Sequence, residues 1–176
     1  ARIDWEELKK AKAPATMYAE DSVGLRAMFR RRQDESKEDL VEKFGLSKES
    51  LAAVARGLAW LAKHQHEDGH WSLQEFYNRV PGKHYPDAGQ MRSDTAATGF
   101  ALLPFLGDGQ THQEGRYQAN VARGIAWLVE HQKENGDLNI RPEGNSRMYA
   151  HAIATIALCE AYGISRDQAL REPAQK

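Results

Sequence analysis

The chain has 176 residues, enough for one domain with a substantial core, and its formal net charge is −1 with a pI near 6.7. This balance predicts no general attraction to nucleic acid or to an anionic membrane surface, and 28% charged residues with a mean hydropathy of −0.70 are typical of a soluble domain. No run of about 20 apolar residues is present, so the sequence predicts no transmembrane helix.

Residues 1–46 are predicted to form an N-terminal arm and helices that precede the main domain, residues 47–176. A short helix or ordered arm is expected over residues 1–19, and two helical runs between 20 and 45. The basic cluster Arg30–Arg32 has a chemistry that suits a phosphate or diphosphate group. Because an acidic run follows it directly, a solvated helix face with local ion pairs is the simpler interpretation.

The main domain contains an internal repeat. Residues 54–71 read VARGLAWLAKHQHEDGHW, and residues 121–138, which lie 67 positions later, read VARGIAWLVEHQKENGDL. Eleven of the eighteen paired positions are identical. Self-similarity at a fixed spacing indicates copies of one structural unit.

Each copy combines an amphipathic helix with a tight exit. Apolar residues recur at helical spacing, and Ser47 is expected to cap the first helix, over residues 47–66. The exit of the first copy has the pattern Gln-Xaa3-Gly-Xaa-Trp, formed by Gln65, Gly69 and Trp71. The glycine suits a left-handed residue after a helix, and the glutamine amide can bind the free polar groups of one helix end and of the next helix start.

These exits are therefore predicted to be structural clamps between successive helices. An aromatic ring over the amide would exclude water from it. The second copy keeps Gln132 and Gly136 but has Leu138 where the first has tryptophan, so its clamp is predicted to be looser.

A long irregular stretch, residues 72–92, follows the first exit because two Pro-containing dipeptides interrupt any regular element. Connections of this length often carry function. The stretch is rich in aromatic and ionisable residues. It is expected to be either a lid over a cavity or a loop on the protein surface. These residues are Phe76, Tyr77, His84, Tyr85 and Asp87.

Two further helices are predicted over residues 94–106 and 147–162, and both are apolar on almost every side, as buried helices are. Asp94 is expected to cap the first, and Pro104 to bend or loosen its last turns. Amphipathic outer helices (47–66 and 113–133), each with one side exposed to solvent, thus alternate with apolar inner helices. This alternation predicts an all-α fold with two walls, an α/α toroid or partial α/α barrel.

Residues 165–176 are predicted to begin another outer helix, at which point the repeat stops. A repeat array that is cut short exposes its last apolar face. We therefore expect either a fragment of a longer ring or an open face that meets a partner or a second copy.

The residues of the repeat also carry a family resemblance. Arg56-Gly57, Trp60-Leu61 and the exit of the first copy resemble the QW motif of squalene–hopene and oxidosqualene cyclases, within the prenyltransferase and squalene cyclase repeat superfamily. The resemblance spans roughly residues 47–163. It implies a terpenoid cyclase-like α/α toroid in which inner-helix ends frame a cavity. The motif is structural in that family and specifies no chemistry.

Cyclases of this family start polyene cyclisation with an Asp-Xaa-Asp-Asp acid at an inner-helix start. This chain has only Asp94 at a comparable place, within Ser93-Asp94-Thr95, and a lone aspartate before a helix is more often a cap. The second inner helix begins near Tyr149 and His151, the best remaining candidates for a functional pair. Whether the chain is an enzyme is left open.

A cavity at the centre of such a ring is predicted to be lined by Phe100, Phe105, Arg147 and Tyr162. The resemblance to protein prenyltransferases implies zinc held by Asp, Cys and His, but Cys159 lies within an apolar helix without a recognisable ligand pattern. His64, His66 and His70 fall inside the first clamp and favour a structural role. No metal and no cofactor is predicted.

Three functions are compatible with these features. The first is binding of, or action on, an isoprenoid or other apolar small molecule in the ring cavity. The second is a non-catalytic repeat scaffold for protein–protein association. The third, a sugar-processing toroid, requires two carboxylates that face one cleft, for which only Asp94 and Asp87 are candidates. No nucleic-acid partner is expected, and the sequence does not specify a compartment beyond a cytoplasmic default.

Overall fold

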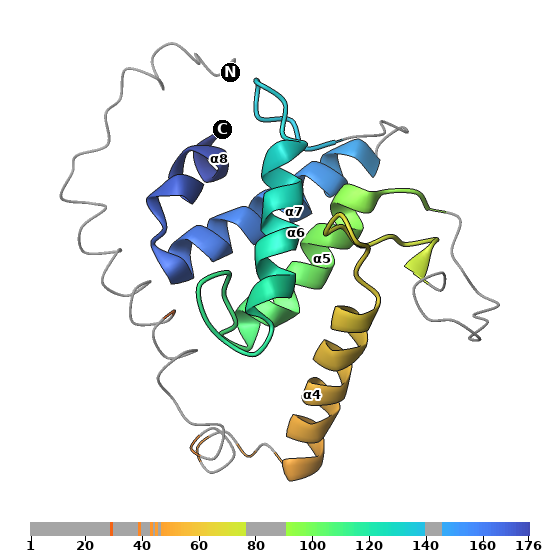
Figure 1. Cartoon of the computed structure of the whole chain (residues 1–176), viewed down its shortest axis with the longest axis vertical. Coiled ribbons are helices and arrows are strands. Elements are labelled where there is room, and N and C mark those ends of the chain that lie inside the picture. The colour runs from red at the N-terminus through yellow and green to blue at the C-terminus, as the bar shows by residue number, and fades with distance from the viewer. Residues whose placement is uncertain are drawn as a thin grey trace, which may run out of the picture.

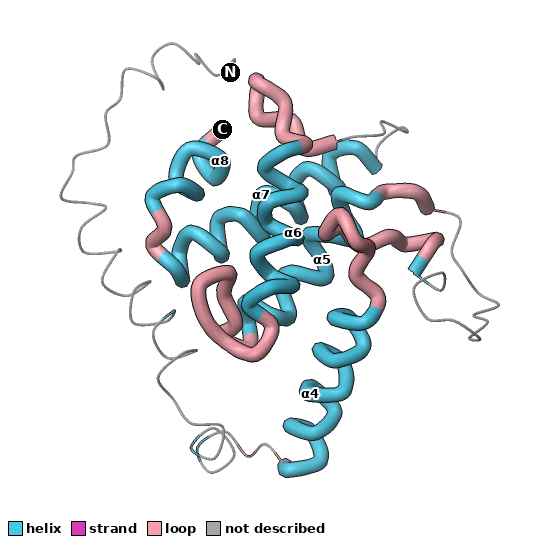
Figure 2. The backbone as a smooth tube through the Cα atoms, in the orientation of Figure 1, coloured by secondary structure: helices cyan, strands magenta, loops and turns pink. Residues whose placement is uncertain are grey.

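The computed structural model describes residues 29, 39, 43, 45, 47–76, 91–139 and 146–176, and these residues form an all-α fold (Figure 1). No strand occurs in these ranges, and the segments between the helices are mostly loops and turns (Figure 2). The helices are α4 (Lys48–Lys63), α5 (Asp94–Gly107), α6 (Gln118–Glu130), α7 (Ser146–Ser165), the 3-10 helix η2 (Gln168–Leu170) and α8 (Arg171–Gln175).

Serine residues cap the first two of these helices. The Ser47 hydroxyl accepts from the backbone N–H of Ser50 at 3.1 Å, and the Ser50 hydroxyl accepts from the N–H of Ser47 at 3.0 Å, so the predicted cap of α4 is confirmed. At α5 the prediction was wrong. The N-cap is Ser93, whose extended backbone lets its hydroxyl accept from Ala96, and Asp94 is the first helical residue.

Helices α5 and α7 pack against each other and form the centre of the fold. A Cβ placed on Gly99 of α5 would lie 2.9 Å from Ile153 of α7, so only glycine allows this approach. Small residues line the facing side of α7. They are Ala150, Ala154, Ala157 and Ala161, all buried. The two helices that were predicted to be inner ones are therefore neighbours, although 38 residues lie between them in the chain.

Helix α6 covers one side of the α5–α7 pair and supplies Val121, Ile125 and Leu128 to the core. It begins at Gln118, five residues later than predicted, because residues 108–117 form turns. Helix α4 contacts α5 and then extends away from the other described helices, as Figure 1 shows. Its only fully buried side chain is Leu58.

The core lies between α5, α6 and α7. Its fully buried large side chains include Leu102, Phe105, Leu106, Leu128 and Leu158. Helix α5 continues through Pro104 to Gly107. Within the described ranges, no helix combines the length and the apolar character that crossing a membrane requires.

Several sequence predictions fall outside the described residues. They concern the arm and helices of residues 1–46 apart from four single positions, the arginine cluster, and most of the predicted lid, including Tyr77, His84, Tyr85 and Asp87. The boundary between residues 1–46 and 47–176 stays a prediction.

Candidate functional site

The first exit joins α4 to the start of α6 through the amide of Gln65. Its Nε2 donates to the carbonyl oxygens of Gly69 at 2.8 Å and of Asn120 at 2.9 Å. Its Oε1 accepts from Asn120 Nδ2 at 2.7 Å and from Arg123 Nη2 at 2.8 Å. Because this buried amide is fully hydrogen-bonded, the exit rigidly connects two outer helices that are far apart in the sequence.

Gly69 is required at this joint for two reasons. Its φ of +104° lies in the region that favours glycine, and a Cβ would lie 2.5 Å from the carbonyl oxygen of Arg123. Trp71 anchors the same exit to α4 and to the core. Its indole N–H donates to the Leu61 carbonyl at 2.7 Å, and its ring packs near Phe105 at a centroid distance of 6.1 Å.

The second exit repeats this arrangement with α8 as the receiving helix. Gln132 Nε2 donates to the carbonyl oxygens of Gly136 at 3.4 Å and of Pro173 at 3.0 Å. A Cβ on Gly136 would collide with the carbonyl of Lys176, as one on Gly69 would with that of Arg123. Helix α8 therefore occupies the place of the first turn of α6, which agrees with the outer helix predicted there.

The histidines of the two exits make the same local contacts. His64 stacks on Trp60 with centroids 3.8 Å apart and donates from Nδ1 to the Trp60 carbonyl at 2.6 Å. His131 stacks on Trp127 at 4.2 Å, and its Nδ1 donates to the Trp127 carbonyl at 2.8 Å. These contacts fix the ends of α4 and α6. In the described part of the chain, no group of three or more His, Cys, Asp or Glu residues is arranged to hold a metal ion.

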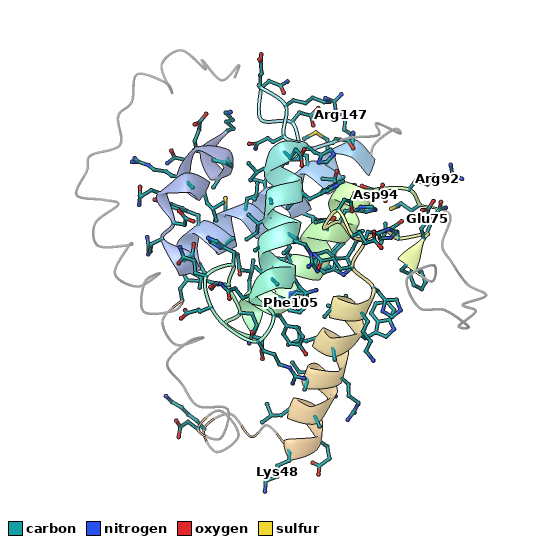
Figure 3. The ribbon with its side chains drawn as sticks, in the orientation of Figure 1. Lys48, Glu75, Arg92, Asp94, Phe105 and Arg147 are labelled. Carbon is teal, nitrogen blue, oxygen red and sulfur yellow. The ribbon has the colours of Figure 1, made fainter. Side chains whose placement is uncertain are left out.

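Asp94 lines a polar pocket of about 230 Å³ at the beginning of α5. Figure 3 shows Glu75, Arg92 and Asp94 close to one another there, and Arg92 Nε donates to Gln74 Oε1 at 2.9 Å. The remaining lining residues are His70 and Ser72. Glu75, which no sequence motif marks, is a second carboxylate in the same pocket.

Arg147 and His151 line a different pocket, of about 340 Å³, at the beginning of α7. Arg147 Nη2 donates to Asp137 Oδ2 at 2.7 Å, and Lys133 Nζ donates to the same oxygen at 2.9 Å. The backbone N–H of Asn139 donates to Oδ1 at 2.9 Å. This N–H, then Lys133 and Arg147, lower the pKa of Asp137 to about 2. His151 Nδ1 accepts from the Leu138 N–H at 3.4 Å.

The structure does not bring together Asp94, Tyr149 and His151, the three residues proposed for catalysis. Asp94 and His151 line separate pockets, and Tyr149 is 72% exposed and lines neither. The four predicted cavity residues are also dispersed. Phe105 is fully buried in the core beside Trp71, whereas Phe100 is 55% exposed on α5.

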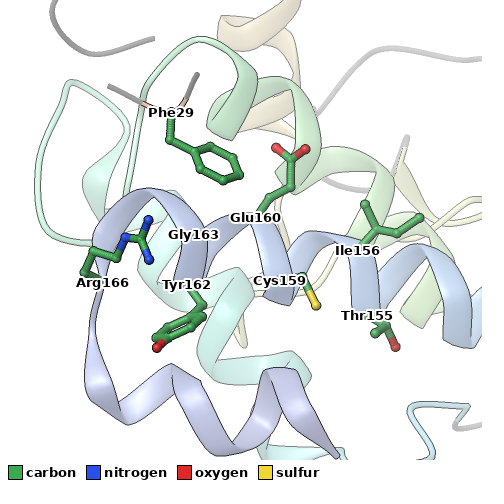
Figure 4. A pocket seen from close by; sticks show the side chains of 8 residues that line it. All are labelled: Phe29, Thr155, Ile156, Cys159, Glu160, Tyr162, Gly163 and Arg166. Atoms are coloured by element: carbon green, nitrogen blue, oxygen red, sulfur yellow. The ribbon is translucent and has the colours of Figure 1, made fainter. Parts of the chain in front are cut away.

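Tyr162 does line a pocket, which lies along α7 and has a volume of about 390 Å³ (Figure 4). Its lining is almost entirely apolar, with Phe29 placed over Gly163 and with Ile156 half-exposed at its edge. Charged side chains are confined to Glu160 and Arg166. The other lining residues are Thr155 and Cys159, and burial raises the pKa of the Cys159 thiol.

Other apolar side chains are exposed on α5 and α7. In an α-helix successive residues are about 100° apart, so Phe100 lies almost opposite Leu102, which packs toward α6 at Gly124. By the same geometry Ile156 and Tyr149 lie opposite the buried Leu158 of α7. We call the exposed side of α5 and α7, with Phe100, Tyr149 and Ile156, the inner face.

The fold and its joints define an all-α protein in which a unit of a helix and a glutamine–glycine exit is repeated. The family model of the squalene-hopene cyclase C-terminal domain matches residues 40–150, well over half of the chain, and the chain belongs to this family. The match includes both exits, α4, α5 and α6. No solved structure matches the chain.

Proposed function

We propose that this domain binds an apolar ligand of the isoprenoid class on the inner face of α5 and α7. The observation that carries the proposal is the pocket of about 390 Å³ along α7, whose lining is mostly apolar and includes two charged residues, Glu160 and Arg166. Pockets of this volume and lining suit small apolar molecules. Phe100 on α5 and Tyr149 on α7 add exposed aromatic rings to these two helices.

The ring arrangement is part of the same proposal. In an α/α toroid the inner helices turn one side toward a shared cavity, and the outer helices cover the other. Gly99 and Ile153 hold α5 beside α7, and Gly124 holds α6 against the side opposite Phe100. This packing supports the proposed role of α5 and α7 as inner helices whose exposed apolar side chains would face such a cavity. Membership of the squalene-hopene cyclase C-terminal family supports it further.

The proposed activity is binding and not cyclisation. Polyene cyclisation requires a carboxylic acid held inside an apolar cavity. Asp94 instead lines a polar pocket with Glu75 and Arg92, apart from the apolar pocket of α7. Ser93 occupies the position before it, and its hydroxyl is engaged in capping α5.

Equilibrium binding of radiolabelled farnesol and squalene, presented in detergent micelles to the complete chain, tests this function. Ile156→Glu places a charge at the edge of the pocket and removes one apolar contact, so we expect the affinity to fall roughly tenfold or more. Ala126→Glu, on the exposed side of α6, is the matched control and should leave binding unchanged. Equal affinities of the two variants, or no saturable binding, would contradict the proposal.

A scaffold role remains the second candidate, because apolar side chains are also exposed away from the inner face, on α4. Light scattering separates the two functions. Self-association that Val54→Glu abolishes would favour a scaffold that uses the exposed side chains of α4. A monomer that binds farnesol or squalene would favour the ligand site.

A further inference from the structure

The two copies of the repeat differ most at the helix face that their Val-Ala-Arg-Gly segments form. In α6 this face is covered. Val121 is 0% exposed, and a Cβ on Gly124 would lie 2.8 Å from the indole ring of Trp71 and 3.0 Å from Leu102. The exit tryptophan and the inner helix that follows it therefore occupy the space beside α6, and glycine is needed there.

In α4 the same residues are uncovered. Val54 is 50% exposed, although it is the counterpart of Val121. A Cβ on Gly57 would meet no described atom within 4 Å. Arg56 is exposed and makes no hydrogen bond or ion pair within the part of the chain that the structure describes. We call Val54, Arg56 and Gly57 the α4 face.

The covered copy also shows which polar groups such a face binds. Arg123 Nη2 donates to Gln65 Oε1 at 2.8 Å, and Gln65 Nε2 donates to the Asn120 carbonyl at 2.9 Å. Arg56 occupies the position of Arg123 in the first copy, and the carbonyl of Ala53 occupies that of Asn120. The α4 face thus offers the guanidinium and the backbone carbonyl that receive a glutamine exit, whereas Ala53 lacks the side-chain amide that Asn120 donates to Gln65 Oε1 at 2.7 Å.

We propose that the α4 face is a docking surface for a further repeat unit, of the kind that residues 64–107 form. The occupant would present a Gln-Xaa3-Gly-Xaa-Trp exit to Arg56 and a leucine of an apolar helix to Gly57. This inference uses a different face from the ligand site proposed above, and it does not depend on that function.

Three observations favour a repeat unit over other occupants. The glycine at position 57 is less favourable than alanine in an isolated α4, but it is needed where an indole ring approaches. The guanidinium of Arg56 matches an amide oxygen, as that of Arg123 does. A second copy of residues 47–176 does not fit, because both of its own exits are already bound to α6 and α8.

The first test uses a fluorescently labelled synthetic peptide of residues 64–107 and the complete chain. Anisotropy should show saturable one-to-one binding. Gly57→Leu fills the space for the indole and should weaken binding at least tenfold, whereas Gly107→Leu, where no described atom lies within 4 Å either, should not. Arg56→Gln should weaken it roughly threefold to tenfold. If Gly57→Leu binds as the unchanged protein does, the peptide is binding elsewhere and the proposal is wrong.

A tandem variant tests the same contact without relying on the folding of an isolated peptide. A second copy of residues 47–113 is inserted directly before Ser47, which preserves the 67-residue repeat spacing. Hydrogen exchange of the α4 amides from Val54 to Leu58 should slow at least tenfold relative to the unmodified chain. Gly57→Leu in the original α4 should abolish this protection. Unchanged exchange in the tandem variant would overturn the proposal.

Discussion

The two copies of the repeat share most of their residues but not their surroundings, and comparing them separates local from tertiary effects. Identical residues produce the same local structure in both, a helix that ends in a stacked tryptophan and histidine and a glycine at positive φ. Burial differs sharply, since Trp60 is 41% exposed and its counterpart Trp127 is 6% exposed. Local sequence thus determines the exit, and distant segments determine what the helix face contacts.

The two joints also differ in their hydrogen bonds, because different segments receive the two glutamines. Gln65 uses both ends of its amide and is buried. Among the described residues, Gln132 makes only the two hydrogen bonds that its Nε2 donates, over longer distances, and it is half-buried. The helix that receives Gln65 is a complete helix, α6, and the helix that receives Gln132 is the five-residue α8. The shorter hydrogen bonds are thus found at the joint whose glutamine binds the longer helix.

The largest expected difference between the copies concerns their glycines. Gly124→Leu forces a side chain into the indole ring of Trp71 and into Leu102, so we expect the free energy of unfolding to fall by about 3 kcal/mol. Gly57→Leu replaces a helical glycine in open space and should raise it by up to about 1 kcal/mol. Urea unfolding of the two variants measures both. Equal effects would show that the α4 face is covered in solution.

The glutamines of the two joints should differ by a smaller amount. Gln65→Ala leaves Asn120 and Arg123 without their acceptor in a buried joint, and we expect a loss of about 2–3 kcal/mol. Gln132→Ala removes two longer hydrogen bonds at a half-buried site and should cost about 1 kcal/mol. Thermal or urea unfolding checks the order, and a larger effect at Gln132 would contradict it.

Much of the fold could be predicted from the sequence because it rests on periodic and local signals. The internal repeat identified the exits, and the apolar character of residues 94–106 and 147–162 identified the two helices that pack together. Local rules also explain the errors. Ser93 and Asp94 are both good caps, and which of them starts the helix depends on one backbone conformation, the extended Ser93.

The candidate site could be predicted less well. Phe105 and Phe100 both lie on an apolar helix, and only the positions of Trp71 and α6 decide that one is buried and the other is exposed. Likewise, Glu75 joins Asp94 in one pocket through the path of the chain after the exit, which no periodic pattern encodes. Residues brought together from separate segments carry no signal in a single sequence.

The smallest expected effect concerns the position after each exit glycine, where the first copy has His70 and the second has Asp137. The N–H of Asn139, with Lys133 and Arg147, lowers the pKa of Asp137 from 3.8 to about 2. A carboxyl with a lower pKa in the folded state stabilises the fold in its ionised form. Its contribution is therefore complete above pH 4 and is lost as the pH falls through about 2.

Asp137→Asn should flatten this acid dependence and, at pH 7, lower the free energy of unfolding by about 1 kcal/mol, because the ion pairs lie near the surface. Urea unfolding between pH 2 and 7 measures the slope for the two proteins. His70→Asn is the matched change in the first copy, and it removes the contact of the imidazole with Asp68 at 2.6 Å. If the acid slope of Asp137→Asn equals that of the unchanged protein, other carboxyls dominate, and the second exit contributes no ionic anchor for α7.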